Sequence, residues 1–527
     1  MPAVRPALDL NPEFLRALHL MEHGAGSVLV TGRAGTGKST LLRYFRDRTR
    51  LRVAVVAPTG VAALNVDGET IHSFFRFRPD VTEEKIKRVR EGDRDLYARL
   101  DALVIDEVSM VRADLLDCVD AHLKLNGPRK GAPFGGVRLF LIGDLYQLPP
   151  VVTKDDRQAF RTTYASPFFF NARSYAALAP EIVELERVYR QHDERFIAVL
   201  NAIRNNTVTD HDLAGLNARV RPDFEPRPDE LVVCLTPTNR AADEINARRL
   251  AALPGASHGF PGRTSGSLER RDLPAPPDLA VKSGAQVMML NNDADGRWVN
   301  GSLGLVHRIV PSRDGPHLLE VELTDGRCVE VTPHTWDLHR YVWNRKARRL
   351  DTEPVGSYVQ YPLRLAWAVT IHKAQGKTFD RVIVDLGARA FAPGQVYVAL
   401  SRCTTLHGLV LHRPLRKSDV FVDRRIVRFL TAKAWGAAEA VLPFDRRLEI
   451  IREAIGKKQA LAMTYLKASD VKSRRVVTPE SVGEMTYRAK SFTAMRAHCH
   501  LRGELRTFRV DRILGLEPAP SPRPPHS

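Results

Sequence analysis

The segment GRAGTGKST, at residues 32–40, constrains what this chain can fold into more than any other feature. It fits the pattern G-x-x-x-x-G-K-[S/T], and it lies between an apolar run, SVLV, and a run with helical spacing, TLLRYFRDR. Such a loop needs a strand before it and a helix after it, because its backbone N–H groups bind phosphate at the N-terminus of that helix. A glycine-rich surface turn is the alternative, but it would have to produce strand, loop and helix in register by chance. The sequence therefore predicts an α/β fold with a phosphate-binding loop.

Each position of this loop has an expected role. Lys38 is expected to reach the β- and γ-phosphates of a nucleoside triphosphate, and the hydroxyl of Ser39 to hold Mg²⁺. Further contacts to the nucleotide are expected from Gly32, Gly35, Thr36, Gly37 and Thr40.

Two further apolar runs end in polar groups suited to hydrolysis. ALVI is followed by Asp106 and Glu107, and LFLIG is followed by Asp144 and then by Gln147. Ligands of parallel sheets bind at the carboxyl ends of strands, so these side chains are expected to face the phosphate-binding loop. We expect Asp106 to hold Mg²⁺, Glu107 to orient or deprotonate the attacking water, and Gln147 to sense the γ-phosphate. Either segment alone would also fit an ordinary surface turn.

The order of the apolar runs predicts two parallel-sheet blocks. Strands are predicted at residues 28–30, 53–57, 103–105 and 137–142 in the first block, and at 231–235, 364–369, 382–386 and 408–411 in the second. Glycine-punctuated β runs within the second block indicate a small inserted β-barrel. The predicted domains are 1–185, with a charged insertion at 76–98 as a wedge candidate; 186–436, interrupted by the barrel at 282–360; 441–517; and a disordered tail, 518–527. The Pro-rich stretch 252–277 is predicted to be a loose connection.

Composition narrows the classes of function. The 527 residues include 79 Lys and Arg against 61 Asp and Glu, and the net charge of +18 suits a polyanionic partner, although it also fits a solvated basic surface. The five cysteines form no CxxC pair, which argues against a zinc ribbon, and we expect them to be buried. No run approaches the roughly 20 apolar residues of a membrane helix. We therefore expect a soluble, cytoplasmic, nucleoid-associated protein.

Nine segments in a fixed order resemble the PIF/RecD-like branch of the superfamily-one DNA helicases. They are GRAGTGKST, APTGVAALNVDGETIHSFF (57–75), IDEVSM (105–110), PFGGVRLFLIGDLYQLPPV (133–151), LERVYRQ (185–191), LTPTNRAADEIN (235–246), GAQVMML with VNGSLG (284–304), VTIHKAQGKTFDRVIVDL (369–386) and YVALSRC (397–403). The resemblance implies two RecA-like motor domains with ATP and Mg²⁺ between them and an SH3-like barrel as the insert. It also implies a monomeric motor that moves 5′ to 3′ on single-stranded DNA and unwinds duplex, with forks, G-quadruplexes and R-loops as substrates it would meet.

The resemblance assigns roles to residues of both motor domains. Arg190 and Arg402 would compensate charge on the γ-phosphate when the cleft closes, with Gly376 beside the nucleotide. DNA contacts are expected from Thr59, His72, Thr238, Asn239, His372 and Lys373. Helix caps, satisfied core histidines and surface ion pairs are the ordinary alternatives for these residue types.

Aromatic residues raise two further points. Phe74, Phe75 and Phe77 would either stack on DNA bases or pack in the core. Many members of the resembled family carry a glutamine ahead of the phosphate-binding loop that reads adenine, but the corresponding segment here, LNPEF, has Phe14. A strict preference for ATP over other nucleoside triphosphates is therefore not implied.

Residues 444–516 resemble a WYL domain, an α+β, β-barrel-like module. The resemblance rests on PFDRRLEIIREAIGKKQALAMTYL, SRRVVTPESV, YRAKSF and ELRTFRVDRILGL, although only Tyr487 of the name-giving triplet is present. A basic cluster favours single-stranded DNA as its ligand and consists of Lys472, Arg474, Arg475, Arg488, Arg506, Arg509 and Arg512. A regulatory ligand or a solvated cationic face are the alternatives. We expect this segment to hold the DNA strand and to couple hydrolysis to translocation.

Two other functions fit part of the sequence. A DNA-stimulated ATPase that remodels protein–DNA complexes without unwinding would carry the same motor residues. A ligand-sensing regulator would use the WYL-like segment but would leave most of the chain unexplained.

Overall fold

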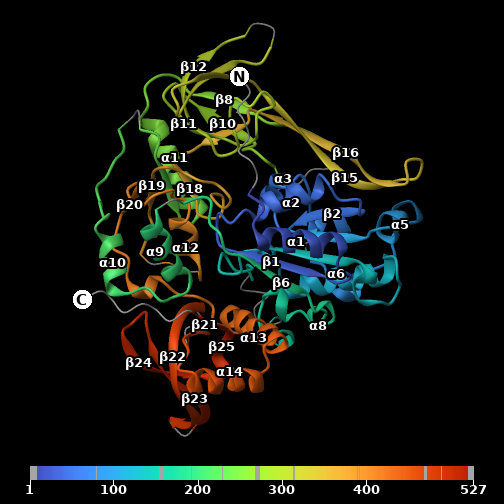
Figure 1. The fold of residues 1–527 in the computed structure, drawn as a ribbon. Coiled ribbons are helices and arrows are strands. Elements are labelled where there is room, and N and C mark those ends of the chain that lie inside the picture. Colours follow the sequence, from blue (N-terminus) through green and yellow to red (C-terminus); the bar gives the residue numbers. More distant parts are fainter. Residues whose placement is uncertain are drawn as a thin grey trace. The chain divides into compact units, whose positions relative to one another are not determined.

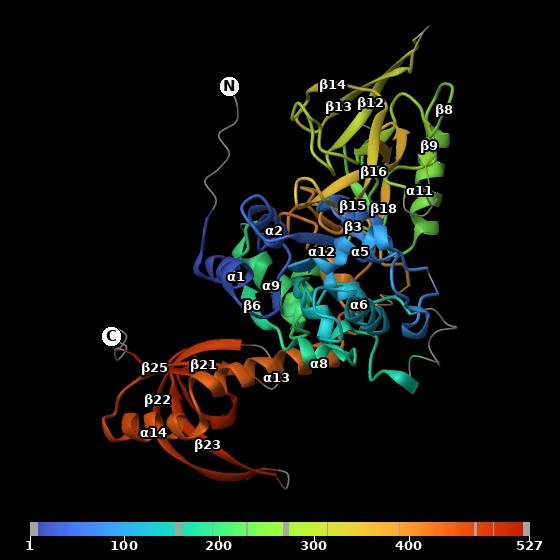
Figure 2. The same ribbon diagram turned by 90° about the vertical axis from the view of Figure 1, so that its right-hand side faces the viewer.

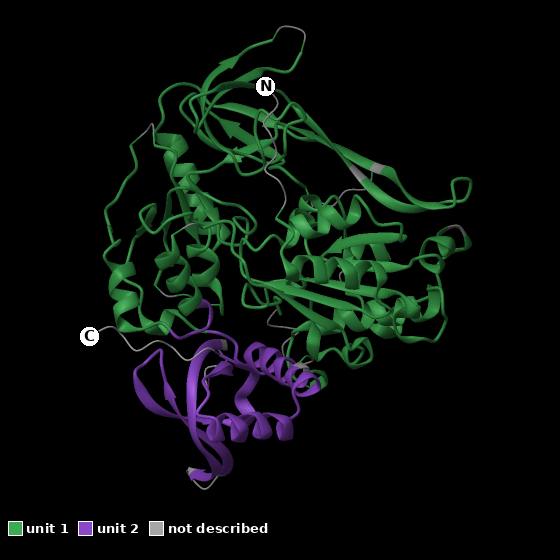
Figure 3. Ribbon diagram, in the orientation of Figure 1, with its two compact units in different colours: residues 1–203, 208–421 green, residues 204–207, 422–527 purple. Residues whose placement is uncertain are grey.

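The computed structural model describes residues 9–519, apart from 79, 153–159, 161, 192, 228–229, 267–272, 313–314, 389, 391, 468–471 and 488–489. Side chains are described for the same residues except 92, 338, 355, 437, 472, 487 and 490. The chain forms two compact units (Figure 3). The first contains residues 1–203 and 208–421, and the second contains residues 204–207 and 422–527.

A six-stranded parallel sheet is the centre of the first lobe of the first unit (Figure 1). Its strands, in spatial order, are β3 (Glu69–Thr70), β2 (Val53–Ala57), β4 (Ala102–Ile105), β5 (Arg138–Gly143), β1 (Val28–Gly32) and β6 (Glu181–Leu185). Every residue of β1 and β4 is buried, as expected of central strands that are covered on both faces. The four strands predicted for this block are confirmed, and β3 and β6 add to them at the edges.

Helices cover this sheet and fix the phosphate-binding loop against it. They are α1 (Pro12–His23), α2 (Lys38–Arg46), α3 (Gly60–Asn65), α4 (Ile71–Phe75), α5 (Glu91–Ala98), α6 (Ala113–Asn126) and α8 (Tyr175–Leu178), with 3₁₀ turns at Glu83–Lys85, Val108–Met110, Pro133–Gly136 and Phe169–Asn171. Leu41, Leu42 and Phe45 of α2 are buried, and the Phe45 ring meets Phe140 of β5 edge to face at 5.6 Å. The helix that follows the loop is thereby anchored on the sheet.

The second lobe contains a four-stranded parallel sheet. The strand order is β18 (Ala368–Thr370), β7 (Val233–Thr236), β19 (Val382–Val384) and β20 (Leu409–Leu411), and the helices are α9 (Glu194–Arg204), α10 (Asp210–Asn217), α11 (Asn239–Ala252) and α12 (Gln395–Leu400), with a 3₁₀ turn at Lys417–Asp419. The prediction of one strand at 364–369 is wrong, because β17 (Leu363–Leu365) pairs with a different sheet. The Asn246 side chain binds the backbone N–H and C=O of Ala368, at 2.9 and 2.8 Å, where the chain changes sheets.

Between α11 and β18, the chain forms a series of antiparallel strands. A five-stranded sheet contains β14 (Cys328–Val331), β13 (Leu318–Leu323), β12 (Leu303–Val310), β11 (Gln286–Met289) and β17. Strand β10 (Asp278–Val281) pairs with β8 (His258–Pro261). Strand β16 (Arg349–Gln360) lies between β15 (His334–Asn344) and β9 (Arg263–Gly266) and pairs with both. The strands therefore begin before the predicted start at 282. The prediction of a loose connection is wrong for residues 258–266, because backbone pairing with β10 and β16 orders them.

The hairpin of β15 and β16 reaches the first lobe and lies beside β3 and α5 (Figures 1 and 2). Tyr341 is its anchor: its backbone N–H donates to Glu69 Oε1 at 2.6 Å, its hydroxyl accepts from the Val55 N–H at 3.3 Å, and its ring meets Phe74 edge to face. The predicted insertion at 76–98 contributes α5 to this contact. The inserted strands are thus tied to the first lobe as well as to the second.

The second unit is an antiparallel sheet with two helices. The strand order is β24 (Glu504–Arg509), β23 (Lys490–Cys499), β22 (Lys472–Tyr487), β21 (Leu461–Leu466) and β25 (Ile513–Pro518), the helices are α13 (Arg424–Val441) and α14 (Phe444–Gly456), and a 3₁₀ turn lies at Val510–Arg512. Ile451 and Ala454 of α14 pack in one core with Met463 and Met495 of the sheet. The unit begins before the predicted 441, because α13 packs against β25 and so belongs with this sheet rather than with residues 186–436.

The structure also describes the surroundings of the cysteines and the length and polarity of the helices. Cys118, Cys234, Cys403 and Cys499 are buried as expected, but Cys328 is exposed at the start of β14. Within the described residues, every helix is too short or too polar to cross a membrane.

Candidate active site

The phosphate-binding loop joins β1 to α2 in the predicted manner. Gly37 begins the helix with φ 88°, and Gly35 has φ 79°. A Cβ atom on Gly35 would lie 2.5 Å from the Cβ of Arg190, so only glycine fits there. Lys38 Nζ donates to the carbonyls of Gly32 and Arg33 at 2.8 and 2.7 Å. The ammonium group is therefore held over the loop, where phosphate oxygens would replace the two carbonyls.

A cavity of about 630 Å³ opens beside this loop. Most of the residues predicted for the nucleotide site line it: Gly35, Thr36, Gly37, Lys38, Ser39, Thr40, Glu107, Gln147, Arg190, Gly376 and Arg402. Gly32 and Asp106 lie just behind this lining. The structure therefore brings together residues that are more than 300 positions apart in the sequence.

Asp106 and Glu107 follow β4, and both are in a low-dielectric setting. Burial raises the pKa of Asp106, against the charge of Lys38, and burial together with the charge of Asp106 raises the pKa of Glu107. Glu107 has φ 48°, a left-handed conformation that is uncommon for a residue with a side chain. Glu107 lines the same cavity as Ser39, and carboxylate and hydroxyl oxygens are ligands that suit a divalent cation.

The two predicted arginines follow different elements: Arg190 follows β6, and Arg402 follows α12. Arg402 is 1% exposed, and its guanidinium donates to the carbonyls of Val398, Ala374 and Lys377 at 3.0, 3.4 and 3.2 Å. Burial, followed by the charge of Arg190, lowers the pKa of Arg402 to about 9. Arg190 Nη2 donates to the Gly376 carbonyl at 3.1 Å. Both guanidinium groups thus hold the backbone of residues 374–377 at the edge of the cavity.

The sequence did not identify two further residues that contact the site. Gln375 Nε2 donates to Glu107 Oε2 at 3.0 Å and to Gln147 Oε1 at 2.7 Å. The hydroxyl of Tyr397, on α12, accepts from the backbone N–H of Ala34 in the phosphate-binding loop at 2.9 Å. Their positions inside the HKAQGK and YVALSRC segments were the available signal, but only the folded chain shows their partners.

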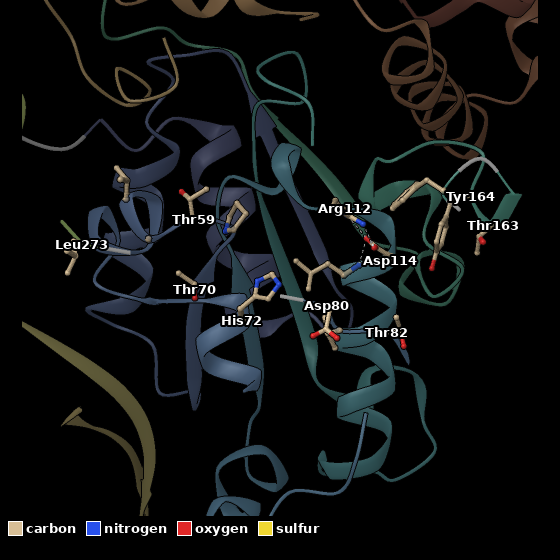
Figure 4. Close-up of a pocket in the computed structure, with 16 residues that line it drawn as sticks. Thr59, Thr70, His72, Asp80, Thr82, Arg112, Asp114, Thr163, Tyr164 and Leu273 are labelled. Atoms are coloured by element: carbon tan, nitrogen blue, oxygen red, sulfur yellow. Dashed lines mark hydrogen bonds and ion pairs between the residues drawn. The ribbon is translucent and has the colours of Figure 1, made fainter. Parts of the chain in front are cut away.

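The DNA candidates of the first lobe line a second cavity, of about 780 Å³ (Figure 4). Thr59 caps α3 by accepting from the Ala62 N–H at 3.2 Å, and His72 lies on α4. Arg112 and Asp114 face the same cavity and form an ion pair at 2.6 Å. Thr59 therefore caps α3 and also lines the cavity.

The DNA candidates of the second lobe follow strand ends. Thr238 caps α11 by accepting from the Ala241 N–H at 3.3 Å, and Asn239 is the first residue of that helix. His372 and Lys373 follow β18, and burial lowers the pKa of both side chains. All four lie at the carboxyl ends of β7 and β18.

Next to them, Lys377 and Asn300 connect three elements. Lys377 Nζ donates to Asn300 Oδ1, and Asn300 Nδ2 donates to Asn65 Oδ1 of α3 at 3.2 Å. Burial, and then the charge of Arg364, lower the pKa of Lys377 to about 8. The inserted strands, the first lobe and the loop after β18 therefore meet at this point.

Phe74 and Phe75 pack in the core, so base stacking by these two residues is excluded. Each is 1% exposed, and both rings contact Tyr97. Phe77 is half-buried and stacks on Phe75 at 5.3 Å. The aromatic cluster stabilises the contact with the hairpin instead.

Phe14 lines the nucleotide cavity but is 4% exposed and packs edge to face on Tyr44. Beside it, the hydroxyl of Tyr189 donates to Asp9 Oδ2 at 2.9 Å and accepts from Asn11 Nδ2 at 3.1 Å. These polar groups are engaged with one another, and Asp9 and Tyr189 line the same cavity as Phe14.

The basic cluster of the second unit is divided between its surface and its core. Arg474 is exposed and lies 3.8 Å from Glu517, and Arg509 pairs with Asp511 at 2.5 Å. Arg475 is buried, with its guanidinium over the Phe508 ring and near Cys499 Sγ, so its assignment as a surface DNA contact is wrong. Arg488 lies outside the described residues.

Comparisons with known proteins agree with these features. The model of the PIF1-like helicase family matches residues 15–213, and that of the WYL domain matches residues 446–518. The chain is 33% identical to the ATP-dependent DNA helicase PIF1 of Emericella nidulans over 486 residues, covering 80% of this chain and 63% of that protein. It is 32% identical to the ATP-dependent DNA helicase Pif1 of Bdellovibrio bacteriovorus, covering 80% of this chain and 92% of that protein.

Solved structures of Pif1 proteins are also similar to this chain. The crystal structure of Bacteroides sp Pif1 in complex with ADP-AlF4 has a TM-score of 0.73 at 34% identity, covering 81% of this chain and 97% of that one. The crystal structure of the same Bacteroides protein bound to ssDNA has a TM-score of 0.60 at the same identity and coverage. The relatives share the two parallel-sheet lobes, which are therefore RecA-like as predicted. The chain belongs to the PIF1-like helicase family.

Proposed function

We propose that this protein is an ATP-dependent DNA helicase that moves 5′ to 3′ along single-stranded DNA and unwinds duplex ahead of it. The observation that carries the proposal is the nucleotide cavity, which is lined by Lys38 and Ser39 of the first lobe together with Arg190 and, from the second lobe, Gly376 and Arg402. A nucleotide in this position would contact both lobes at once. Its hydrolysis would then change the contact between the lobes, which is the requirement for a motor.

The roles of the residues follow from their chemistry. Lys38 would exchange the carbonyls of Gly32 and Arg33 for β- and γ-phosphate oxygens, and Glu107 would take a proton from the attacking water. Ser39 and Asp106 would hold Mg²⁺, which when bound neutralises charge on the phosphate oxygens. Arg190 and Arg402 would offset the charge that develops on the γ-phosphate.

The DNA path is proposed along the carboxyl ends of the strands of both lobes. It would pass Thr59 and His72 on the first lobe, then Thr238, His372 and Lys373 on the second. The Bacteroides relative that was solved with ssDNA supports a single strand as the ligand. We place the five-stranded sheet of the insert in the SH3-like class, and we expect a monomer to suffice, because the residues that line the nucleotide cavity all come from one chain.

Two measurements test this function. Steady-state ATP hydrolysis should rise when single-stranded oligonucleotide is added, and strand displacement should convert a forked duplex to single strands. Stimulated hydrolysis without displacement would favour the alternative, an ATPase that remodels protein–DNA complexes. Equal hydrolysis with and without oligonucleotide would contradict both.

The nucleotide site is expected to discriminate weakly between bases. Phe14 offers no hydrogen-bonding group, and the hydroxyl of Tyr189 is engaged with Asp9 and Asn11. A surface that contacts a base without hydrogen bonds discriminates poorly, so kcat/KM for ATP and GTP should differ by less than about tenfold. Phe14→Gln should raise the preference for ATP. A wild-type preference near 10,000-fold, the scale of hydrogen-bonded readout, would contradict this expectation.

We also propose that the second unit, which resembles a WYL domain, binds the single strand through exposed basic residues such as Arg474 and Arg506. A chain ending at Phe421 lacks this unit and keeps both motor sheets. Fluorescence anisotropy should show about tenfold weaker binding to oligothymidylate, with a shallower dependence on salt because fewer phosphates are neutralised. Unchanged affinity together with unchanged unwinding would remove this role.

A further inference from the structure

One side-chain amide of the second lobe binds Glu107, which the proposed reaction assigns to the attacking water, and Gln147, which is expected to sense the γ-phosphate. Gln375 Nε2 donates to Glu107 Oε2 at 3.0 Å and to Gln147 Oε1 at 2.7 Å. An amide NH₂ group has two donors, which matches these two acceptors. The bridge crosses from the loop after β18 to the ends of β4 and β5 in the first lobe. Glu107 and Gln147 are thereby held together by a group that takes no part in binding phosphate.

The backbone of the same loop is fixed by the two arginines of the site. Arg190 donates to the Gly376 carbonyl, and Arg402 donates to the carbonyls of Ala374 and Lys377, at distances between 3.1 and 3.4 Å. A shift of the loop therefore changes the position of Gln375 and of both guanidinium groups together.

The other contacts of this loop lead to the proposed DNA path. His372 and Lys373 lie three and two residues before Gln375 in the sequence. Two residues after it, Lys377 contacts Asn300, which in turn contacts Asn65 of the first lobe. A strand that binds to these groups would act on a loop whose centre holds Glu107 and Gln147.

We propose that Gln375 is a positioning residue that makes hydrolysis depend on DNA. The inference rests on the proposed function and names the regulation of its active site. Without DNA, the amide keeps Glu107 and Gln147 occupied, so the attacking water lacks its base. When a strand engages the loop, the amide withdraws, Glu107 turns to the water and Gln147 turns to the γ-phosphate. Gln375 touches neither phosphate nor water in this account, and it acts only through Glu107 and Gln147.

Two variants test the bridge. Gln375→Ala removes the amide, and Gln375→Glu keeps the size of the side chain while replacing the donor with an acceptor. ATP hydrolysis without DNA should rise about fivefold in both, the factor expected for losing one ordinary hydrogen bond. The rate at saturating oligothymidylate should stay within about twofold of wild type, because the bridge is already broken there. The ratio of stimulated to unstimulated rate therefore falls. A ratio that stays at the wild-type value, or an unstimulated rate that falls, would overturn the inference.

Arg381→Ala is the matched control. It removes a surface ion pair with Glu230, at 3.2 Å, and Arg381 is the residue that directly precedes β19, after the same loop. Both rates should remain at wild-type values, which separates the loss of the bridge from a general loosening of the second lobe.

A binding measurement separates this inference from the proposed function. DNA would break the bridge, and a bound nucleotide would weaken it by competing for Gln147 without breaking it. Each ligand therefore lowers the cost that the other meets, and linkage requires the effect to be mutual. Affinity for labelled oligothymidylate is measured with and without a non-hydrolysable ATP analogue, and the ratio of the two affinities should fall in Gln375→Ala. If Gln375→Ala changes this affinity ratio but the protein does not hydrolyse ATP, the role of Gln375 is supported and the proposed helicase function is contradicted. An unchanged ratio in a DNA-stimulated enzyme would do the reverse.

Discussion

Glu107→Gln is expected to bind ATP with near wild-type affinity and to hydrolyse it about 100- to 10,000-fold more slowly, the range that a general base contributes. The substitution keeps the shape of the side chain and leaves an amide that cannot take a proton from water. Because burial and the neighbouring Asp106 already disfavour the charge of Glu107, losing that charge should not weaken the fold. Binding of a fluorescent ATP analogue and single-turnover hydrolysis measure the two effects separately.

Glu69→Gln is the control for Glu107→Gln, because it replaces a buried carboxyl group with an amide outside the nucleotide cavity. Glu69 is another buried carboxyl group of the first lobe, but it accepts from Ser73 and from the backbone of Tyr341, away from the nucleotide cavity. This variant should hydrolyse ATP at the wild-type rate. If Glu107→Gln also turned over at a near-normal rate, Glu107 would not be the base.

Lys38→Ala is expected to lower hydrolysis by roughly 1,000-fold, which is the upper range for removing one preorganised donor from a developing charge. Lys38 is held over the loop through its bonds to the carbonyls of Gly32 and Arg33. Its loss removes a charge-assisted contact that strengthens as the γ-phosphate departs, so kcat should fall more than nucleotide affinity. Steady-state kinetics with DNA present, together with equilibrium binding of the nucleotide, give both quantities.

Lys124→Ala is the corresponding control. Lys124 is partly exposed and pairs with Asp120 of α6 at 2.6 Å, and Asp120 also accepts from the backbone N–H of Phe134, a bond that this variant keeps. Wild-type kinetics are expected for it. Retention of more than about a tenth of the wild-type rate in Lys38→Ala would contradict the assigned phosphate contact.

The motor strands could be predicted because burial on both faces gives short, continuous apolar runs. The same pattern gave a wrong prediction at residues 364–369, because this continuous apolar run forms two strands that belong to different sheets. Periodicity cannot show that the chain leaves one sheet at Leu365 and enters another at Ala368. It also missed β9, whose four residues are all exposed and which is ordered by backbone pairing with β16. Backbone pairing of exposed residues leaves no hydrophobic pattern to read.

The nucleotide site could be predicted because its residues follow strands that end at one edge of the sheet. The residues that could not be predicted act through partners far away in the sequence. Gln375 meets Glu107 and Gln147, and Tyr341 meets Glu69, only after the lobes and the hairpin have come together. Charge alone was a poor guide in the second unit, since alternation along β22 places Arg474 outside and Arg475 inside.

The most direct test of the account is strand displacement on two duplexes that differ only in the polarity of their single-stranded tail. If ATP hydrolysis between the lobes moves them 5′ to 3′ along one strand, the wild-type protein should separate the duplex with a 5′ tail and leave the duplex with a 3′ tail intact, and Glu107→Gln should separate neither. Equal separation of both duplexes, or separation without ATP, would contradict the central claim that nucleotide turnover drives directional movement.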